Sequence, residues 1–463
     1  MANVSKNTDI PAFLTFQRLS VCMSSSLRPP GPNRLPLVGN THQYARDPFT
    51  FITAVERAYG DVAAFELAGQ RTYMLTNPRD IERVLVGEAA SFRKPVFGDD
   101  AVAELLGTGL LLSEGDTWRR QRNLASEAFH PRRFETFTET ISAYATDLVE
   151  AWEDGDVIDV REEMAHLTVR IIVDTMFGTT IDDETTANVQ AALEPLGARF
   201  EPDARRFLLP NWLPTSENRA FHDAVGTLED VLDDVVAERR AGAIDGDDLL
   251  SVLLRAQERG EQTDRQLRDE LVTMLLAGHD TTALLLTYTF YLLDQHPAVR
   301  DRLYAELDEV GDDVSFDELR SLTYTEHVLD ETMRLYPPVY TMFRTATSDV
   351  ELAGYDLPAE SLFMLPQWAV HRSDRWYDDP ERFDPDRWAP QRARDRPRFA
   401  FFPFGGGPRI CIGKQFSLVE AKLILAAVAA EYELDRVDDD PLQLRPSLTM
   451  HPQTPVRMRL ESR

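Results

Sequence analysis

Hydrophobic residues recur at helical spacing along most of the chain. In the segment 216–240, apolar residues follow one another at intervals of three or four, which predicts an amphipathic helix. The same periodicity predicts helices over 162–177 and 323–336. The alternation typical of strands is confined to 61–76, around a Gly-Gln-Arg turn, and to 339–368. We therefore expect a mainly α protein with a small β region.

The longest predicted helix is interrupted by polar residues. It begins at the capping-box sequence Thr263-Asp264-Arg265-Gln266 and ends before His296-Pro297. It would span about 32 residues, or roughly 48 Å. Its middle reads Ala277-Gly278-His279-Asp280-Thr281-Thr282. An interior glycine costs about 1 kcal/mol relative to alanine, and a carboxylate in an apolar helix needs a partner or must stay neutral. Such a departure from the apolar, helix-favouring pattern of the surrounding residues is typical of a functional site.

A single cysteine follows a glycine-rich turn near the C-terminus. Cys411 lies in the segment 404–413, Phe-Gly-Gly-Gly-Pro-Arg-Ile-Cys-Ile-Gly, and an apolar, helix-patterned run follows over 416–434. Backbone N–H groups at a helix N-terminus would favour its thiolate. A structural buried cysteine is the simpler interpretation. The glycines, Arg409 and Phe404 favour instead a thiolate bound to a flat, anionic metal cofactor, which would be haem.

The amino-acid composition indicates the class of protein and its cellular compartment. The chain has 463 residues, 43% of them hydrophobic, and two cysteines. This predicts a globular protein without a disulfide framework in a reducing, cytoplasmic setting. No run of about 18 apolar residues occurs, so we expect no transmembrane anchor. We expect residues 1–27 to be an N-terminal extension, disordered or produced by a wrongly assigned start, and 28–463 to be one catalytic domain.

The charge is strongly acidic. The net charge is −29, from 78 acidic against 49 basic residues, and only four of the basic residues are lysines. Such a surface repels nucleic acids and anionic membranes. Acidic excess with few lysines resembles the proteins of halophilic archaea, which predicts such an origin; a moderately acidic mesophile is the alternative.

With these segments in view, the chain resembles the cytochrome P450 family of haem-thiolate monooxygenases. Residues 404–413 fit that family's F-x-x-G-x-R-x-C-x-G signature at every fixed position. The resemblance implies a triangular prism of helices with small β-sheets. It also implies haem b as the cofactor, with Cys411 as the axial ligand of its iron, Gly413 in the same loop, and Phe404 packed beside the sulfur.

The interrupted helix resembles the oxygen-activation motif of this family, A/G-G-x-D/E-T-T. The resemblance implies that Gly278 leaves room for dioxygen. It also implies that Asp280 and Thr281 deliver the protons that cleavage of the O–O bond requires.

Two further motifs match. Glu331-Thr332-Met333-Arg334 resembles the E-x-x-R helix, a weak signal by itself because such pairs are common on helix surfaces. Together with Pro380-Glu381-Arg382-Phe383, it implies a buried triad of Glu331, Arg334 and Arg382 that supports the cysteine loop.

Trp118-Arg119-Arg120-Gln121-Arg122 resembles the helix that binds the haem propionates. Trp118 and Arg122 share one helix face at this spacing, and a surface cation–π pair is the alternative. By analogy with the family, Arg344 and Arg409 should also reach the propionates.

The family's topology implies a lipophilic substrate. The residues expected in its pocket are Phe97, Val339, Thr341, Met342, Leu448 and Thr449. A fatty acid, an isoprenoid and a carotenoid all remain open.

We therefore predict a monomeric monooxygenase that inserts one atom of dioxygen into a lipophilic molecule. No flavin or iron–sulfur module is recognised in the sequence, so the electrons would come from a separate ferredoxin and its reductase. A peroxide-driven peroxygenase or an isomerase of the same fold is an alternative, although these typically lack the acid–alcohol pair. A non-catalytic haem sensor or electron carrier is an alternative of another class.

Overall fold

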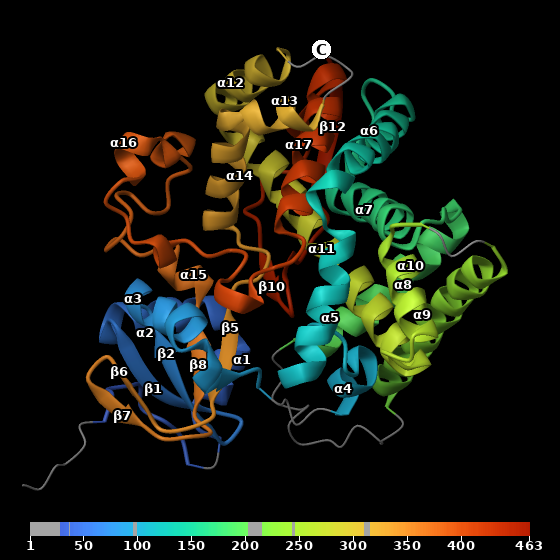
Figure 1. Ribbon diagram of the computed structural model, residues 1–463. Coiled ribbons are helices and arrows are strands. Elements are labelled where there is room, and N and C mark those ends of the chain that lie inside the picture. Colours follow the sequence, from blue (N-terminus) through green and yellow to red (C-terminus); the bar gives the residue numbers. More distant parts are fainter. Residues whose placement is uncertain (1–27, 37, 96–99, 202–214, 243–245, 310–314) are drawn as a thin grey trace, which may run out of the picture.

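The computed structural model describes residues 28–36, 38–95, 100–201, 215–242, 246–309 and 315–463. The expected N-terminal extension and Phe97 lie outside these residues. The described chain is mainly helical, and a smaller β region lies to one side of the helices (Figure 1). The predicted mainly α class with a small β region is confirmed.

The long helix α11, Asp264–Gln295, lies at the centre of the helical part. It has 32 residues and begins with the predicted capping box between Thr263 and Gln266. The helices α7 (Val160–Phe177), α14 (Thr323–Leu335) and α17 (Lys414–Glu431) pack against it. Most of its residues between Leu267 and Leu293 are buried.

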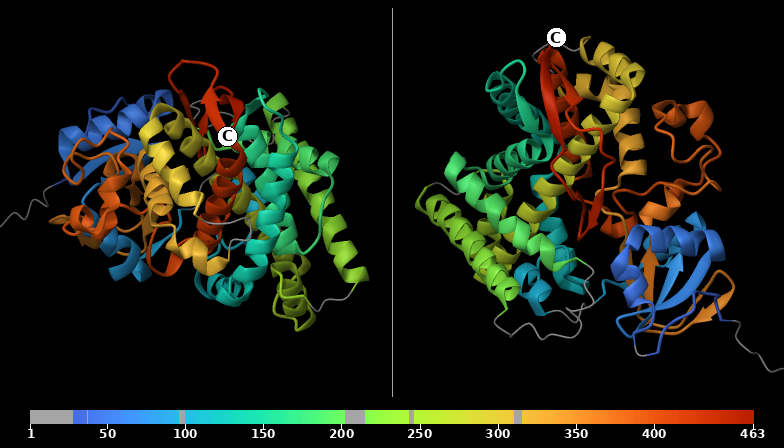
Figure 2. Two further views of the ribbon diagram at one scale, coloured as in Figure 1. Left: turned by 90° about the horizontal axis from the view of Figure 1, so that it is seen from above. Right: turned by 180° about the vertical axis from the view of Figure 1, so that it is seen from behind.

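Most of the remaining helices belong to the helical part, whereas the first helices of the chain lie beside the β region (Figures 1 and 2). The predicted helix at 216–240 is α9, Ser216–Ala241, and the predicted helices at 162–177 and 323–336 correspond to α7 and α14. The other α-helices are α1 (Thr41–Arg46), α2 (Pro48–Tyr59), α3 (Pro78–Glu82), α4 (Asp100–Leu106), α5 (Gly115–Ala128), α6 (Phe134–Glu150), α8 (Asp183–Arg199), α10 (Leu249–Glu258), α12 (Pro297–Leu307), α13 (Phe316–Ser321), α15 (Gln367–Val370) and α16 (Pro390–Ala393).

The larger sheet has the strand order β1-β2-β8-β5-β3. Its hairpin turns at Ala68 and Gly69, which both have positive φ values. The parallel pair β2 and β8 joins the hairpin to strands from the second half of the chain. These strands are β1 (Val62–Leu67), β2 (Gln70–Leu75), β3 (Phe92–Arg93), β5 (Met342–Ala346) and β8 (Leu362–Leu365); β6 (Val350–Leu352) and β7 (Tyr355–Leu357) form a separate hairpin.

The restriction of strands to two regions is wrong, because further strands lie at 92–93, at 157–159 and near the C-terminus. The predicted helical run 416–434 ends at Glu431, and a strand begins at Tyr432. Tyr432 and Leu434 are both buried and lie two positions apart, the spacing of one face of a strand. These strands are β4 (Val157–Asp159), β9 (Tyr432–Arg436), β10 (Leu444–Pro446), β11 (Met450–Pro452) and β12 (Arg457–Ser462).

None of the helices in the described ranges combines the length and the apolar character needed to cross a bilayer.

Candidate active site

Glycines fold the Cys411 loop tightly against two neighbouring segments. Gly405 and Gly407 have left-handed φ values of 72° and 66°. A Cβ atom on Gly407 would overlap the carbonyl oxygen of Leu85, and one on Gly406 would come within 2.5 Å of the Phe399 ring. The backbone N–H of Cys411 donates to the Phe404 carbonyl over 3.0 Å. The loop therefore needs residues without side chains, and its bonding fixes where the sulfur lies.

The sulfur of Cys411 lies just before the first turn of α17. The residue is exposed and unpaired. Crowding by the protein around the sulfur raises the pKa of the Cys411 thiol, while the N–H groups of Gly413 and Lys414 and the guanidinium of Arg122 act in the opposite direction. The N–H groups at the helix N-terminus favour the thiolate, as expected, but desolvation of the sulfur outweighs them. Binding of a metal would supply the missing stabilisation of the thiolate.

The polar interruption of α11 presents different residues to different sides. Ala277 is exposed although its helix is otherwise mostly buried, and Thr281 is half-buried with its hydroxyl donating to the Ala277 carbonyl over 3.1 Å. Next to it, the hydroxyls of Thr282 and of Ser417 on α17 are 2.9 Å apart. This contact places the open face of α11 near the first turns of α17, which begins three residues after Cys411.

Gly278 does not lie on this open face. A Cβ atom there would lie 2.6 Å from Cδ1 of Ile172 on α7. The expectation that Gly278 leaves room for dioxygen is therefore wrong, since α7 fills that room. The glycine instead allows the two helices to approach closely, and the residue that shares the face of Thr281, four positions earlier, is Ala277.

Asp280 is bound to the C-terminal hairpin. Its Oδ2 accepts a hydrogen bond of 2.6 Å from the Thr449 hydroxyl and lies 3.3 Å from Nε2 of His451. Burial raises the pKa of Asp280. The attraction of His451 and these hydrogen bonds lower the pKa by more than burial raises it, so the net pKa lies below the usual value. The carboxylate of Asp280 is thus partnered inside an apolar helix, as its position requires.

Positive side chains gather beside the Cys411 loop. Arg409 donates to the Ser113 carbonyl and to Glu114, and its guanidinium lies 4.5 Å from the centre of the Trp118 ring. Burial, followed by the charge of Arg409, lowers the pKa of Arg344 to about 10. Burial, then Arg344 and Arg409, lower the pKa of Lys94 to about 7, which Glu114 partly opposes. Three cations therefore share one carboxylate, and the cluster is suited to a further anion.

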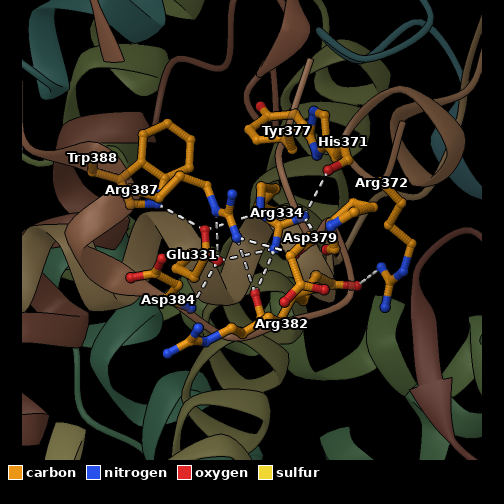
Figure 3. A network of polar contacts seen from close by, with 12 residues as sticks. Glu331, Arg334, His371, Arg372, Tyr377, Asp379, Arg382, Asp384, Arg387 and Trp388 are labelled. Carbon is orange, nitrogen blue, oxygen red and sulfur yellow. Dashed lines mark hydrogen bonds and ion pairs between the residues drawn. The ribbon is translucent and has the colours of Figure 1, made fainter. Parts of the chain in front are cut away.

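Glu331 and Arg334 form a buried ion pair on α14. Both side chains are fully buried, and Nε of Arg334 lies 2.9 Å from Oε2 of Glu331. Arg387 donates to Oε1 of Glu331 over 3.1 Å, and the indole N–H of Trp388 donates to Oε2 over 3.0 Å. The backbone N–H of Asp384 is a further donor. Figure 3 shows these donors converging on the one carboxylate.

The third member of the triad is Arg387, and the expectation of Arg382 is wrong. The Arg382 side chain is exposed, and only its carbonyl takes part, accepting from Arg334 and Arg387. Proline, arginine and an aromatic residue occur twice in a row, at 380–383 and at 385–388. The second copy forms a short 3-10 helix that turns Arg387 inward.

Comparison with known proteins decides the family. A family model described as Cytochrome P450 matches residues 29–458. The chain belongs to the cytochrome P450 family. It is an oxygenase enzyme, since relatives named as a monooxygenase and an oxygenase match most of its length.

Three of these relatives come from Streptomyces. Cyclooctat-9-en-7-ol 5-monooxygenase of Streptomyces melanosporofaciens is 35% identical, over 87% of this chain and 88% of its own. Cyclooctatin synthase of the same organism is 34% identical, over 93% and 95%. Pentalenene oxygenase of Streptomyces avermitilis is 33% identical, over 93% and 97%.

The haem-thiolate cofactor of the cytochrome P450 family fits the residues of this site. Haem carries two propionates, and the buried Arg344 and the half-buried Lys94 and Arg409 exceed their one carboxylate partner among the described residues, Glu114. Cys411 offers an exposed sulfur at a glycine-lined loop. Trp118 lies under Arg409 in the same cluster. Arg122 lies near Cys411 instead: burial lowers the pKa of Arg122, and the Cys411 sulfur partly opposes this.

The expected pocket residues of this cytochrome P450 lie in several environments. Val339 and Thr341 are half-buried, and the Thr341 hydroxyl has no partner among the described residues. Met342 lies against Gly405 of the cysteine loop. A Cβ atom on Gly405 would come within 2.9 Å of the terminal methyl group of Met342. Leu448 is 44% exposed, and Thr449 is buried and engaged with Asp280.

Sequence reasoning missed Lys94 and Glu114 in this cluster. Glu114 accepts from the backbone N–H of Lys94 over 2.7 Å and pairs with Arg409 over 2.5 Å. Strand β3 brings this segment beside β5, the strand of Arg344. No signal in the local sequence marks either residue, because the pairing of β3 with β5 is what brings this segment to the site.

The choice between Arg387 and Arg382 can be tested by substitution. We expect Arg387→Ala to lower the free energy of unfolding by about 3–5 kcal/mol, because it leaves the buried Glu331 charge short of a partner. Haem content after expression should fall with it. Arg382→Ala is the matched control, and we expect a change within about 0.5 kcal/mol. Equal losses for the two variants would contradict the assignment.

Lys94 predicts a pH-dependent stability of the haem-free protein. Its pKa falls from 10.5 to about 7 on folding, so between these values the unfolded chain binds more protons and stability rises with pH. The full penalty is present below pH 7. We therefore expect Lys94→Met to raise the free energy of unfolding more at pH 6 than at pH 10, measured by denaturant titration.

The exposed Lys414 provides the control for this measurement. Lys414→Met should change stability by similar small amounts at both pH values. A Lys94→Met effect that is the same at pH 6 and pH 10 would show that Lys94 is not desolvated as described.

Proposed function

We propose that this cytochrome P450 is a haem-thiolate monooxygenase that oxidises a cyclic terpenoid. The observation that carries the proposal is that the exposed sulfur of Cys411 and the open face of α11 lie on neighbouring elements, joined by the contact between Thr282 and Ser417. The thiolate of Cys411 would hold the haem iron, with Lys94, Arg344 and Arg409 as partners for the propionates. When bound, the haem supplies the activation of dioxygen.

The residues of α11 would handle protons. Thr281 has its hydroxyl on the open face, and Asp280, the next residue back, is linked to the hairpin of 444–452. A hydroxyl and an acid in sequence can pass a proton to a reacting oxygen. This arrangement supports monooxygenation over the peroxide-driven and the non-catalytic alternatives, which do not need it.

The relatives narrow the class of substrate. The names of all three Streptomyces relatives refer to cyclooctatin, cyclooctatenol or pentalenene. These are cyclic terpenoids, so among the fatty acid, isoprenoid and carotenoid classes they favour a compact isoprenoid. The apolar side chain of Met342, which lies against the cysteine loop, is compatible with such a substrate.

The electrons would come from a separate ferredoxin and its reductase. This part of the proposal rests on the absence of a recognisable flavin or iron–sulfur module in the sequence. The acidic composition, with a net charge of −29, makes salt a variable in any assay of partner docking. An origin in a halophilic archaeon stays a prediction from composition.

The reaction class can be tested at Thr281. We expect Thr281→Val to lower the product formed per electron pair at least about tenfold, because the variant lacks the hydroxyl. Thr281→Ser should behave like the wild type. The carbon monoxide spectrum of the reduced protein controls for thiolate ligation in each variant. Equal yields from Thr281→Val and wild type with a ferredoxin system would contradict the proposal, and product formed with peroxide alone would favour the peroxygenase.

The substrate class can be tested by ligand-induced spin-state change. We expect pentalenene or a related cyclic terpenoid to shift the haem spectrum and to be hydroxylated with reductase and ferredoxin present. Titrations at low and high salt separate substrate binding from partner docking. A shift with long-chain fatty acids but not with cyclic terpenoids would contradict the terpenoid assignment while leaving the monooxygenase class intact.

A further inference from the structure

Two neighbouring carboxylates on α11 hold the segment that follows α4. Oδ2 of Asp269 accepts from the backbone N–H of Thr108 over 2.7 Å and from the Thr108 hydroxyl over 3.1 Å. Oε2 of Glu270 accepts from the backbone N–H of Leu110 over 3.2 Å. Asp269 and Glu270 are only 1% and 2% exposed. Residues 107–110 therefore lie on α11, and hydrogen bonds to two buried side chains fix them there.

Glycines let the backbone of this segment touch the helix. A Cβ atom on Gly107 would lie 2.1 Å from Oδ2 of Asp269, and one on Gly109 would lie 2.1 Å from Oγ1 of Thr273. Gly107 also has a left-handed φ of 46°. A side chain at either position would push the segment away from α11, so the close contact depends on both glycines.

The segment covers the same helix face that is open further along α11. Ala277 follows Glu270 by seven positions and Thr281 by eleven, so both lie within about 20° of Glu270 around the helix axis. Glu270 is buried, whereas Ala277 is exposed and Thr281 is half-buried. Along the helix, Glu270 is about 10 Å from Ala277 and about 16 Å from Thr281. Residues 107–110, which we call the end wall, thus close one end of the open face.

The chain continues from the end wall to the cysteine loop. The Ser113 carbonyl accepts from Arg409 over 3.0 Å, and the carboxylate of Glu114 accepts from the same guanidinium. Residues 107–114 therefore run from α11 to the cysteine loop, the two elements that would enclose the haem. Charged side chains fix this segment at both ends, so the end wall has a defined position relative to the site.

We propose that Asp269 and Glu270 limit the length of the substrate by holding the end wall across the open face of α11. The wall leaves room for a compact molecule beside Thr281 and blocks a long linear chain that lies along α11. This inference rests on the proposed function, because it assigns the open face to the substrate. Both carboxylates are positioning residues, since they act through the end wall.

Glutamine and alanine at position 270 separate the hydrogen bond from the charge. Burial raises the pKa of Glu270 to about 8; the Leu110 N–H opposes this shift, and the charge of Asp269 adds to it. Glu270 is therefore mostly protonated at pH 7, and the carbonyl oxygen of a glutamine can accept from Leu110 in its place. Alanine removes the acceptor and leaves the Leu110 N–H without its partner, which weakens the attachment of the end wall.

The end wall can be tested with ligands that bind the haem iron through nitrogen, because the haem spectrum then reports their fit without turnover. We expect Glu270→Ala to bind N-butylimidazole with the wild-type Kd at pH 7. It should bind N-dodecylimidazole at least about tenfold more tightly than the wild type, since burying two further methylene groups is worth about that factor. Glu270→Gln is the matched control and should bind both ligands like the wild type.

Gly109→Ala displaces the end wall by a different means. Its Cβ atom would overlap Thr273, so this variant should also bind N-dodecylimidazole more tightly. Gly226→Ala on α9 is the control, because a Cβ atom there meets nothing within 4 Å. The carbon monoxide spectrum of the reduced protein verifies thiolate ligation in each variant. A wild-type ratio of the two Kd values in Glu270→Ala, or in Gly109→Ala if Glu270→Ala fails to bind haem, would overturn the inference.

The wild type itself provides a test that no misfolded variant can obscure. We expect it to bind N-dodecylimidazole no more tightly than N-butylimidazole, although the longer chain is more apolar. Binding of N-dodecylimidazole at least about tenfold tighter than that of N-butylimidazole would overturn the end wall, because the additional methylene groups would then be buried.

Cyclic terpenoids separate this inference from the proposed function. If they shift the wild-type haem spectrum while N-dodecylimidazole binds far more tightly than N-butylimidazole, the end wall alone is overturned. If they give no shift while the expected binding of the two imidazoles is observed, the proposed substrate class is contradicted and the end wall is supported.

Discussion

The burial of the Glu331 carboxylate is the constraint on which the rest of the site depends. A charge with no access to water needs several donors, and they come from Arg334 on its own helix and from Arg387, Trp388 and the backbone of Asp384, more than fifty residues away. Satisfying one carboxylate therefore fixes α14 to the segment that precedes the cysteine loop. The cost of leaving such a charge unpaired makes this arrangement effectively obligatory.

The same network extends to the cysteine loop through backbone bonds. Arg334 donates to the His371 carbonyl, and Nε2 of His371 accepts from the Phe402 N–H over 3.0 Å. Burial, followed by the charge of Arg334, lowers the pKa of His371 to about 3, so the ring stays neutral and can accept. Gln367 donates to the Phe402 carbonyl. Hydrogen bonds that begin at Arg334 on α14 thus fix the position of the cysteine loop, and with it the Cys411 sulfur. The side chain of Cys411 takes no part in these bonds.

Regular features of the fold were predictable because they repeat over many residues. The ends of α9 and α11 follow from periodicity and a capping box, and the Cys411 segment follows from ten contiguous positions. Arg387 was not predictable in this way, because residues 380–383 and 385–388 have the same chemistry and only the path of the chain turns one of them inward. Lys94 joins the site only through the pairing of β3 with β5, which leaves no trace in the local sequence.

The partial errors on α11 have a different cause. Motif matching assigned a role to Gly278 by its place in a string of letters, whereas a helix separates neighbours by 100° and places Ala277, not Gly278, on the face of Thr281. Helical geometry was available from the sequence and would have distinguished the two. Thr449 could not have been connected to Asp280 without the fold, since 169 positions separate them.

The distribution of charge explains how a chain with a net charge of −29 can hold an anionic cofactor. A few of its cations in the described residues are buried: Arg334 and Arg387 surround Glu331, Arg344 is buried, and Lys422 pairs with Glu326. Interactions of the exposed carboxylates fall off within about 8 Å at physiological salt, but buried contacts are screened much less. Salt therefore weakens the repulsion between the surface and an approaching anion while leaving the cations around Arg344 and Arg409 nearly at full strength. Acidity outside and positive charge inside are compatible because they act over different distances.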